Sequence, residues 1–370
     1  MNKKIIFSGG GTGGHIFPAI NLMKHFADKK YEVILITDNR GNSFIKNNSE
    51  FRSYIINAST LTKKSMIEKF FSLFFIFYSI IKAIIILKKE KPDLVFGLGG
   101  YVSFPISFAS KFFNLPLIIY ENNMVLGRAN KYLSTFSKKI LLAKKIKENF
   151  PEKYENKTYE VGPILSKNII NSTPNKATID SKKFSILVLG GSQGAEIFGK
   201  VVPDVIKMVK DQGHEIEIYQ QCTSWQKNLL IDFYKKNNIN NYVFEFEKNI
   251  LQLILSSNIA ITRCWASTTA ELAHTFTPFV AVPLPNSIDN HQYLNAKYYE
   301  TKGCCWLLEQ NNFNTKNLFN LIIKNIKNRN QLENIKENMK KNYNKNVYSN
   351  IEREIKEFIE IWKLILLATK

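Results

Sequence analysis

The stretch KIIFSGGGTGGH, residues 4–15, decides the fold of this chain. Its first five residues form an apolar run that predicts a β-strand, and the glycines that follow predict a tight turn. Residues Phe17–Ala27 then have the apolar spacing of a helix. Glycine lets the backbone approach a ligand closely, and a helix N-terminus supplies free N–H groups and the positive end of a dipole. The stretch therefore predicts a strand–turn–helix unit with an anion-binding turn.

Further apolar runs continue this alternation along the first half of the chain. They are Glu32–Thr37, Leu94–Phe96, Pro116–Tyr120 and Lys139–Leu142. Strands that alternate with helices predict a parallel sheet covered on both faces, so the fold class is α/β.

The same pattern begins again at Phe184–Leu189, which is followed by the glycine turn GGSQG at 190–194. Further strands are expected at Glu215–Tyr219, Tyr242–Phe246, Ile259–Thr262 and Phe279–Val282. A chain of 370 residues favours two domains. We expect an N-terminal domain at 1–163, a polar linker at 164–183 and a C-terminal domain at 184–345. A last helix at 346–370 is expected to pack back on the first domain.

The net charge is +20, from 51 Lys plus Arg against 31 Asp plus Glu. This surplus favours anionic partners, although a composition bias spread over the surface explains part of it. No pattern of a nucleic-acid-binding module occurs, so we expect no nucleic-acid partner. The four cysteines include no CxxC pair, which favours reduced thiols in a cytosol.

The segment Phe70–Leu87 contains 18 residues with one charge, Lys82, which meets the length threshold for a spanning helix. A strand and a glycine turn follow it directly, which favours a helix between two strands. Lysines flank both of its ends. We therefore predict a helix that lies partly in the core and partly on an anionic membrane surface. A wholly buried helix and a true span remain open.

The first glycine loop contains Thr12, Gly13 and Gly14, and His15 stands at the start of the helix. The helix dipole favours a neutral imidazole there, which makes His15 a candidate general base. A capping or packing histidine is the alternative. The loop also satisfies GxGxxG, and Asp38 ends the second strand, so a dinucleotide-dependent oxidoreductase stays open.

Two more loops follow strands of the first domain. The loop Gly97–Ser103 is expected to meet the first loop, because loops at the carboxyl ends of strands line the ligand crevice of an open α/β sheet. The amide-rich run that contains Asn123 suits hydrogen bonds to sugar hydroxyls.

In the second domain, Ser192 lies in the glycine turn and can donate to a phosphate oxygen. Ser267 is expected to cap the helix that follows Ile259–Thr262, and Glu271 one turn later can accept both ribose hydroxyls. Gln292 can bond sugar hydroxyls. No DxD pair occurs, so we expect no metal and no cofactor, with helix N-termini neutralising a pyrophosphate.

Six runs, in this order, carry a resemblance to a known family. They are GGTGGHIFPA (10–19), GLGGYVSFP (97–105), ENNMVLGRANK (121–131), GGSQGA (190–195), ASTTAELA (266–273) and HQYLNA (291–296). The chain resembles the UDP-N-acetylglucosamine–N-acetylmuramyl-(pentapeptide) pyrophosphoryl-undecaprenol N-acetylglucosamine transferases. The resemblance implies a GT-B fold, in which two Rossmann-like domains face a cleft. It also implies inverting transfer of N-acetylglucosamine from UDP-N-acetylglucosamine to a polyprenyl-pyrophosphate-linked muramyl-pentapeptide, by a peripheral enzyme on the cytoplasmic face of the bacterial inner membrane.

The resemblance also assigns roles to residues. It implies that His15 assists deprotonation of the acceptor hydroxyl. Donor-site positions are implied at Thr12, Gly13, Gly14, Asn123, Ser192, Ala266, Ser267, Thr268, Thr269, Ala270, Glu271 and Gln292. The chain departs from the family at Ser166, where relatives have an arginine near the domain junction, and at Trp265, where they have a glycine. Another GT-B lipid glycosyltransferase and a non-enzymatic membrane scaffold remain alternatives.

Overall fold

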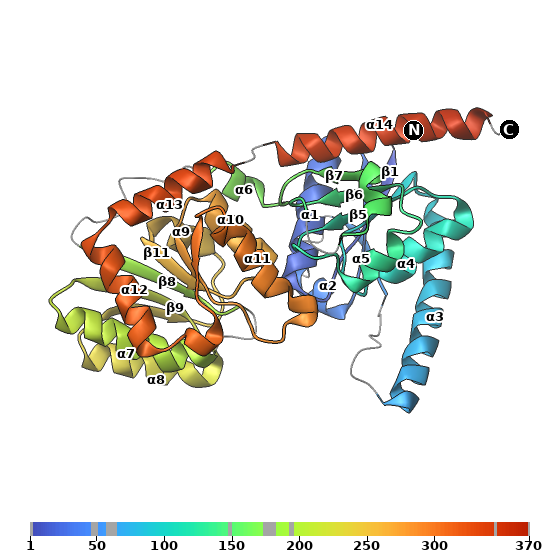
Figure 1. Cartoon of the computed structure of the whole chain (residues 1–370). Helices are drawn as coiled ribbons and strands as arrows, with labels where there is room; N and C mark the ends of the chain where they lie inside the picture. The colour runs from blue at the N-terminus through green and yellow to red at the C-terminus, as the bar shows by residue number, and fades with distance from the viewer. Residues whose placement is uncertain are drawn as a thin grey trace. The chain divides into compact units, whose positions relative to one another are not determined.

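The computed structural model describes residues 3–45, 51–56, 65–146, 150–172, 183–191, 196–343 and 346–368. At 66, 67, 69, 70 and 360–368 it describes the backbone alone. The chain divides into two compact units (Figure 1). Unit 1 contains Met1–Ser166 together with Asn344–Lys370, and unit 2 contains Lys167–Tyr343. The chain thus passes between the units at 166–167, inside the segment expected to be a linker. Half of that segment, 173–182, lies outside the described residues.

Unit 1 has a seven-stranded parallel sheet in the order β3-β2-β1-β4-β5-β6-β7, counted over the described residues. Its strands are β1 (Lys4–Ser8), β2 (Glu32–Thr37), β3 (Arg52–Ile55), β4 (Leu94–Gly97), β5 (Leu117–Glu121), β6 (Lys139–Leu142) and β7 (Thr158–Glu160). Its helices are α1 (Gly13–Asp28), α2 (Asn39–Ile45), α3 (Met66–Glu90), α4 (Ser103–Ala109), α5 (Arg128–Leu133) and α14 (Val347–Ala368), with short 3-10 turns η1 (Ser110–Phe113) and η2 (Glu152–Lys157). The strand order reverses between β1 and β4, so the loops after these two strands meet at the carboxyl edge.

Unit 2 repeats the design with a six-stranded parallel sheet in the order β10-β9-β8-β11-β12-β13, again over the described residues. Its strands are β8 (Phe184–Leu189), β9 (Ile216–Gln221), β10 (Asn240–Phe244), β11 (Ile259–Thr262), β12 (Phe279–Ala281) and β13 (Cys305–Leu307). Its helices are α6 (Lys167–Ile170), α7 (Glu196–Asp211), α8 (Ser224–Lys236), α9 (Ile250–Ser256), α10 (Ala266–His274), α11 (His291–Glu300), α12 (Thr315–Lys327) and α13 (Asn330–Lys341), with 3-10 turns η3 (Ile288–Asn290) and η4 (Gln310–Asn312). Here the order reverses between β8 and β11.

Each sheet carries a separate apolar core on each of its two faces. The central strands are buried on both faces, which explains why they are continuous apolar runs in the sequence. The α/β fold class with two Rossmann-like domains is therefore confirmed. The buried residues of α14, such as Ile351 and Ile355, belong to the core of unit 1.

The strands that the sequence did not predict lie at sheet edges. β3 and β7 border the first sheet, and β13 borders the second. All residues of β3 and β7 are half-buried or exposed, so neither strand has the apolar run of a central strand. At the other edge, β10 begins at Asn240 instead of Tyr242, for the same reason.

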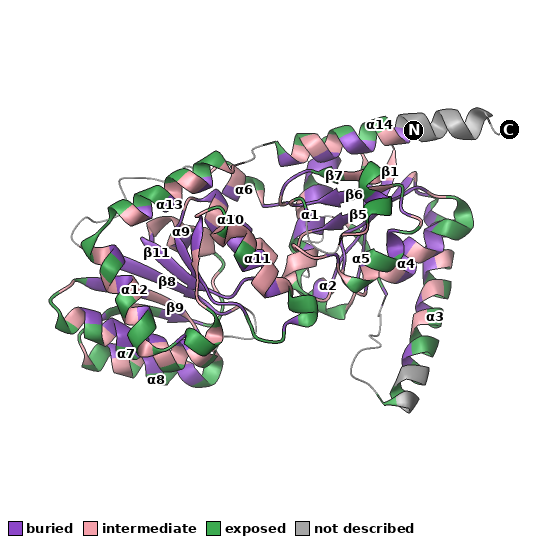
Figure 2. Ribbon diagram, in the orientation of Figure 1, coloured by how far each residue is buried: buried purple, intermediate pink, exposed green. Residues whose placement is uncertain are grey.

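Helix α3 is longer than predicted, and its start is fixed by a capping box. The Ser65 hydroxyl accepts from the Glu68 N–H at 3.3 Å, while the Glu68 carboxylate accepts from the Ser65 N–H at 2.8 Å. Lys91 ends the helix in the left-handed conformation. From residue 71 onward, one side of α3 carries its buried residues and the other side is exposed (Figure 2).

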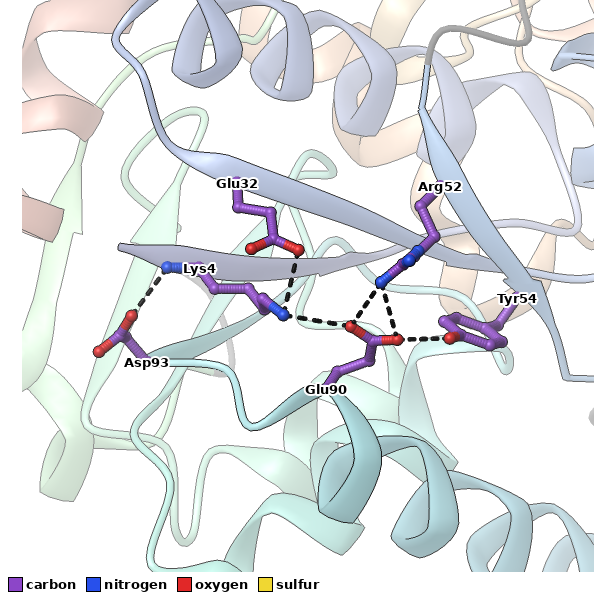
Figure 3. A network of polar contacts seen from close by, with 6 residues as sticks. All are labelled: Lys4, Glu32, Arg52, Tyr54, Glu90 and Asp93. Carbon is purple, nitrogen blue, oxygen red and sulfur yellow. Dashed lines mark hydrogen bonds and ion pairs between the residues drawn. The ribbon is translucent and has the colours of Figure 1, made fainter. Parts of the chain in front are cut away.

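A network of charged groups fastens the C-terminal end of α3 to the sheet (Figure 3). The buried Glu90 carboxylate accepts from Arg52 at 3.1 and 3.2 Å, from Lys4 at 3.2 Å and from the Tyr54 hydroxyl at 2.5 Å. These cationic and hydroxyl partners lower the pKa of Glu90, against the opposing effect of burial. Lys4 and Arg52 begin β1 and β3, so α3 is tied to the amino edge of the sheet.

Candidate active site

The glycine turn after β1 leads directly into α1. Gly11 has a φ of +78°, which favours glycine. Thr12 precedes the helix in an extended conformation, and its carbonyl accepts from the N–H groups of both His15 and Ile16. Its side chain makes no capping hydrogen bond. The first turn of α1 therefore presents the N–H groups of Gly13 and Gly14 at the carboxyl edge of the sheet.

His15 connects this turn with the loop after β4. Its Nδ1 lies 2.9 Å from the carbonyl oxygen of Leu98. Its ring lies so close to Gly99 and Gly100 that a Cβ at either position would come within 3.1–3.2 Å of ring atoms. Because a carbonyl can only accept, Nδ1 carries the proton, and in a neutral ring Nε2 is the nitrogen that can accept one. The expectation that these two loops meet is confirmed.

Asp38, at the end of β2, braces the same turn from the other side. Its Oδ1 accepts from the Gly11 N–H at 3.0 Å and from the Gly41 N–H at 2.8 Å, in the first turn of α2. This oxygen is therefore already used within the protein, whereas the dinucleotide hypothesis required the carboxylate to bind a ribose. Sequence reasoning missed this role, although an acidic residue directly before a helix is a known cap signal.

Glu121, at the end of β5, organises the loop that carries Asn123. Its buried carboxylate accepts four hydrogen bonds: from the N–H and the Nδ2 of Asn123, from the Gly127 N–H and from the Nδ2 of Asn130, at 2.9–3.0 Å. Asn123 is thus held at the carboxyl edge by the Glu121 carboxylate, for which no role was predicted from the sequence.

In unit 2, α10 begins at the carboxyl end of β11. Trp265 precedes the helix with a φ of −66° and a ψ of 136°, and no side chain caps the helix. The prediction that Ser267 is the cap is therefore wrong, because Ser267 lies within the first turn. The first intrahelical bond runs from the Thr269 N–H to the Trp265 carbonyl. The N–H groups of residues 266–268 consequently point out of the helix start, as an anion-binding turn requires.

Glu271 follows one turn into α10 and is only partly exposed. Burial raises the pKa of its carboxyl to about 7. No charged or hydrogen-bonding group within the described part of the chain opposes that shift. Among the described residues, the carboxylate therefore lacks the partners that Glu121 has. It lies on the same short helix as the first-turn N–H groups of residues 266–268.

Gln292, in α11, is fully buried and holds the loop before α10 in place. Its Oε1 accepts from the N–H groups of Cys264 at 3.2 Å and Leu284 at 3.0 Å. Its Nε2 has no hydrogen-bond partner among the described residues. The predicted role of Gln292 toward sugar hydroxyls thus stays a prediction for Nε2, while Oε1 already serves the loop.

Trp265 has an ordinary backbone conformation at the position where the family resemblance implies a glycine. Its indole Nε1 lies against Gly191, where an added Cβ would come within 2.6 Å of it, and its ring lies 5.7 Å from that of His291. The indole therefore occupies space beside the glycine turn of unit 2. Ser192, predicted to donate to a phosphate from this turn, lies outside the described residues.

Arg263 is a buried cation that the sequence analysis gave no role. Its guanidinium donates to the carbonyls of Val282 and Pro283 at 3.2 Å and to the Gln310 side chain at 2.6 Å. Burial lowers its pKa. These acceptors are neutral, so none of them cancels the positive charge of the Arg263 guanidinium.

The predicted site residues fall into two sets, one in each unit. Thr12, Gly13, Gly14, His15 and Asn123 gather at the carboxyl edge of the first sheet. The second set, Ala266, Ser267, Thr268, Thr269, Ala270, Glu271 and Gln292, gathers at the carboxyl edge of the second sheet. Over the described residues, no group of three His, Cys, Asp or Glu side chains is placed to hold a metal ion.

Comparison with known proteins first gives the class of enzyme. Residues 5–142 match the glycosyltransferase family 28 N-terminal domain, and residues 185–353 match the C-terminal domain of that family. A crystal structure of MurG from Acinetobacter baumannii has a TM-score of 0.78, with 96% of this chain and 100% of that chain covered. At 23% identity, that likeness supports the fold.

Individual relatives then identify the family within this class of glycosyltransferases. A protein from Pelagibacter ubique is 36% identical over 332 residues, covering 90% of this chain and 91% of the relative. A protein from Rickettsia bellii is 35% identical over 336 residues, covering 90% and 93%. Both are named UDP-N-acetylglucosamine–N-acetylmuramyl-(pentapeptide) pyrophosphoryl-undecaprenol N-acetylglucosamine transferase. The chain belongs to this family of glycosyltransferases.

Proposed function

We propose that the chain transfers N-acetylglucosamine from UDP-N-acetylglucosamine to the undecaprenyl-pyrophosphate-linked N-acetylmuramoyl-pentapeptide. The observation that carries this proposal is the start of α10, where first-turn N–H groups have no acceptor within the helix and Glu271, whose pKa is raised by burial, follows on the same helix. Such a helix suits a nucleotide diphosphate, because the amides bind phosphate oxygens and the carboxylate accepts ribose hydroxyls. The names of the relatives supply the particular sugar and acceptor.

The nucleotide part of the donor would then bind in unit 2. The amides of Ala266, Ser267 and Thr268 would stabilise the negative charge that grows on UDP as the glycosidic bond breaks. Thr269 and Ala270 continue that first turn toward Glu271. Gln292 would donate from Nε2 to the donor, which gives its buried amide the partner that the described residues lack. Thr12, Gly13, Gly14, Asn123 and Ser192 remain proposed donor-site positions on the evidence of the resemblance.

His15 would act on the acceptor. Its Nε2 accepts the proton of the acceptor hydroxyl while the oxygen forms a bond to the anomeric carbon and the bond to the UDP oxygen breaks. The Leu98 carbonyl supports this role because it fixes the tautomer and the orientation of the ring. Attack from the face opposite the leaving group inverts the anomeric configuration.

The transfer would take place at the cytoplasmic face of the inner membrane, with α3 as the docking helix. Residues 71–90 are long and apolar enough to cross a membrane, although one side of this helix belongs to the core of unit 1. Phe74 and Phe77 are 64% and 62% exposed. An apolar face with lysines at the end of the helix favours a helix that lies on an anionic bilayer over one that spans it.

The purified chain, mixed with UDP-N-acetylglucosamine and the lipid-linked acceptor in vesicles containing phosphatidylglycerol, tests this function. We expect formation of the lipid-linked disaccharide. Absence of transfer by a preparation that binds UDP would refute the acceptor assignment. Phe74→Ser with Phe77→Ser should weaken vesicle binding and leave transfer to a short-chain, water-soluble acceptor unchanged.

A further inference from the structure

The backbone around Trp265 is held in place from both sides of the residue. The Cys264 N–H donates to the Oε1 of Gln292 at 3.2 Å, and the Cys264 carbonyl accepts from the Asn295 amide at 3.1 Å. The Trp265 carbonyl accepts from the N–H and the hydroxyl of Thr269, at 3.0 and 3.1 Å. Trp265 is therefore fixed between α11, which braces the residue before it, and the first turn of α10.

The indole of Trp265 lies where the strand order of unit 2 reverses. The strands β8 and β11 are neighbours, and the turn after β8 carries Gly191, which has a φ of +79°. A Cβ added at Gly191 would come within 2.6 Å of the indole Nε1, so the ring lies against this turn. Ligands of open α/β sheets bind in the crevice at such a reversal. Because Trp265 is only partly buried, a ligand in that crevice can touch it.

Two polar side chains of α11 accompany the indole. The ring of His291 lies 5.7 Å from it, and the Nδ1 of His291 lies 2.7 Å from the Ile288 carbonyl oxygen, which leaves Nε2 to accept in a neutral ring. Gln292 follows His291 and is fully buried, and its Nε2 has no partner among the described residues. An apolar aromatic surface with a few polar groups beside it is the usual composition of a site for a small ligand.

The order of the groups in a nucleotide sugar indicates which of them meets the indole. That order is base, ribose, two phosphates and hexose. Glu271, one turn into α10, is proposed to bind the ribose, and the N–H groups of residues 266–268 are proposed to bind the phosphates. The hexose follows the phosphates, so it would lie beyond the start of the helix, which is where Trp265 stands.

We propose that the indole of Trp265 binds one face of the hexose ring of the donor. This inference rests on the proposed binding of the donor nucleotide in unit 2 and adds a contact to it. The C–H groups on a face of a pyranose ring are apolar, and an indole offers them a flat apolar surface. The Nε2 atoms of Gln292 and His291 would bond hydroxyls at the edge of the sugar. Because the product UDP lacks the hexose, the indole would favour the substrate over the product at this site.

Calorimetric titration with UDP and with UDP-N-acetylglucosamine, in the absence of acceptor, tests this contact. The quantity of interest is the ratio of the two affinities in each variant. We expect Trp265→Leu to lower the ratio about fivefold, a change of about 1 kcal/mol. Trp265→Phe keeps an aromatic face and should lower it less than about twofold. Trp225→Leu, which removes an exposed indole from α8, is the matched control and should leave the ratio unchanged.

The affinity for UDP shows whether each variant is folded, and it separates the two proposals. An unchanged ratio in Trp265→Leu would overturn the hexose contact and leave the proposed function standing. Absence of UDP binding by the unmodified chain would refute the proposed nucleotide site, and the hexose contact with it. If the indole instead stacked on the base, both affinities would fall together and the ratio would stay constant.

UDP-glucose, which lacks the acetamido group, tests the assignment to the ring face. We expect Trp265→Leu to weaken binding of UDP-glucose and of UDP-N-acetylglucosamine by the same factor. A loss confined to UDP-N-acetylglucosamine would overturn that assignment, because the indole would then contact the acetamido group.

Tryptophan fluorescence adds a measurement that a purely structural role of Trp265 would not change. The chain contains four tryptophans. We expect UDP-N-acetylglucosamine to shift the emission of the unmodified chain to shorter wavelength more than UDP does, because the hexose displaces water from the indole. This difference should disappear in Trp265→Phe and persist in Trp225→Leu. Equal shifts with the two ligands in the unmodified chain would contradict the proposal.

Discussion

The two units present similar loops at the carboxyl edges of their sheets, but they treat the polar groups there differently. In unit 1, Asp38 and Glu121 accept backbone and amide donors, and Nδ1 of His15 is paired with a carbonyl. In unit 2, Glu271 has a raised pKa from burial, and Nε2 of Gln292 has no partner among the described residues. Unit 1 therefore uses its two carboxylates within the protein and orients one imidazole, although Thr37 Oγ1 and Asn130 Oδ1 lack partners among the described residues. Unit 2 differs because its carboxylate, Glu271, and the Nε2 of Gln292 are left for a ligand.

This difference has a cost in stability. A buried polar group without a partner costs about 1–3 kcal/mol, and sites that must bind a ligand retain such groups. Substitutions of these groups in unit 1 should therefore lower turnover or stability. Substitutions of Glu271 in unit 2 should raise stability and lower UDP affinity. Four variants test that expectation, in order of decreasing effect.

His15→Ala should have the largest effect. Loss of a general base lowers turnover about 100- to 10,000-fold, and UDP affinity should change less than about twofold if the donor binds unit 2. Steady-state kinetics and calorimetric titration with UDP measure the two quantities. His25→Ala, in the same helix but paired with Glu352 of α14, is the control and should retain turnover. Undiminished turnover in His15→Ala would remove the imidazole from the mechanism.

Glu121→Ala should mainly affect folding. It leaves the donors of Asn123, Gly127 and the buried Asn130 without their shared acceptor, which should lower the free energy of unfolding by about 3 kcal/mol. Urea denaturation measures this loss. Glu160→Ala, an exposed carboxylate 3.9 Å from Lys144, should change stability by no more than about 0.5 kcal/mol. Similar results for the two variants would contradict the view of Glu121 as the organiser of its loop.

Glu271→Gln should act in the opposite direction on folding. The pKa of Glu271 is raised from 4.5 to about 7, so the folded state favours the protonated form, and stability falls as pH rises through this interval. The variant should therefore gain thermal stability over the unmodified chain at pH 8 and not at pH 4. Its UDP affinity at pH 8 should fall about tenfold, because the amide cannot accept two ribose hydroxyls as the carboxylate does.

In the unmodified chain, UDP affinity should rise as pH increases through about 7, as the carboxyl of Glu271 ionises. That pH dependence should be absent from Glu271→Gln. A stability gain in the variant that does not depend on pH would show that burial of the charge is not its origin.

Trp265→Gly should have the smallest effect. It introduces the residue that the family resemblance implies at this position and removes the indole from beside Gly191. We expect UDP affinity to rise less than about fivefold, because the glycine turn becomes more open, at a loss of about 1 kcal/mol of stability from the apolar contact. Calorimetric titration measures the first quantity and thermal denaturation the second. A fall in UDP affinity would mean that the indole contributes to binding.

The central strands, the glycine turns and the helices after them could be predicted from the sequence, because each depends on local pattern. Edge strands such as β3 and β7 could not, since pairing on one side leaves no continuous apolar run. For the site, the sequence predicted which loops form it but not which hydrogen bonds hold them. The roles of Asp38 and Glu121 depend on which backbone N–H groups tertiary folding brings to them, and the absence of a cap at Ser267 depends on where α10 begins. Among these, only the bond from the Gly41 N–H to Asp38 has a local signal, the acidic residue directly before a helix.

The Glu90 network determines how a force on α3, the proposed docking helix, is transmitted into unit 1. The partners of Glu90 include Lys4 and Arg52, which begin β1 and β3, while the turn that leads to His15 follows the opposite end of β1. If α3 docks on the membrane as proposed, a force from an undulating bilayer passes through Glu90 into the amino edge of the hydrogen-bonded sheet. The carboxyl edge, with His15, then keeps its alignment while the membrane surface moves.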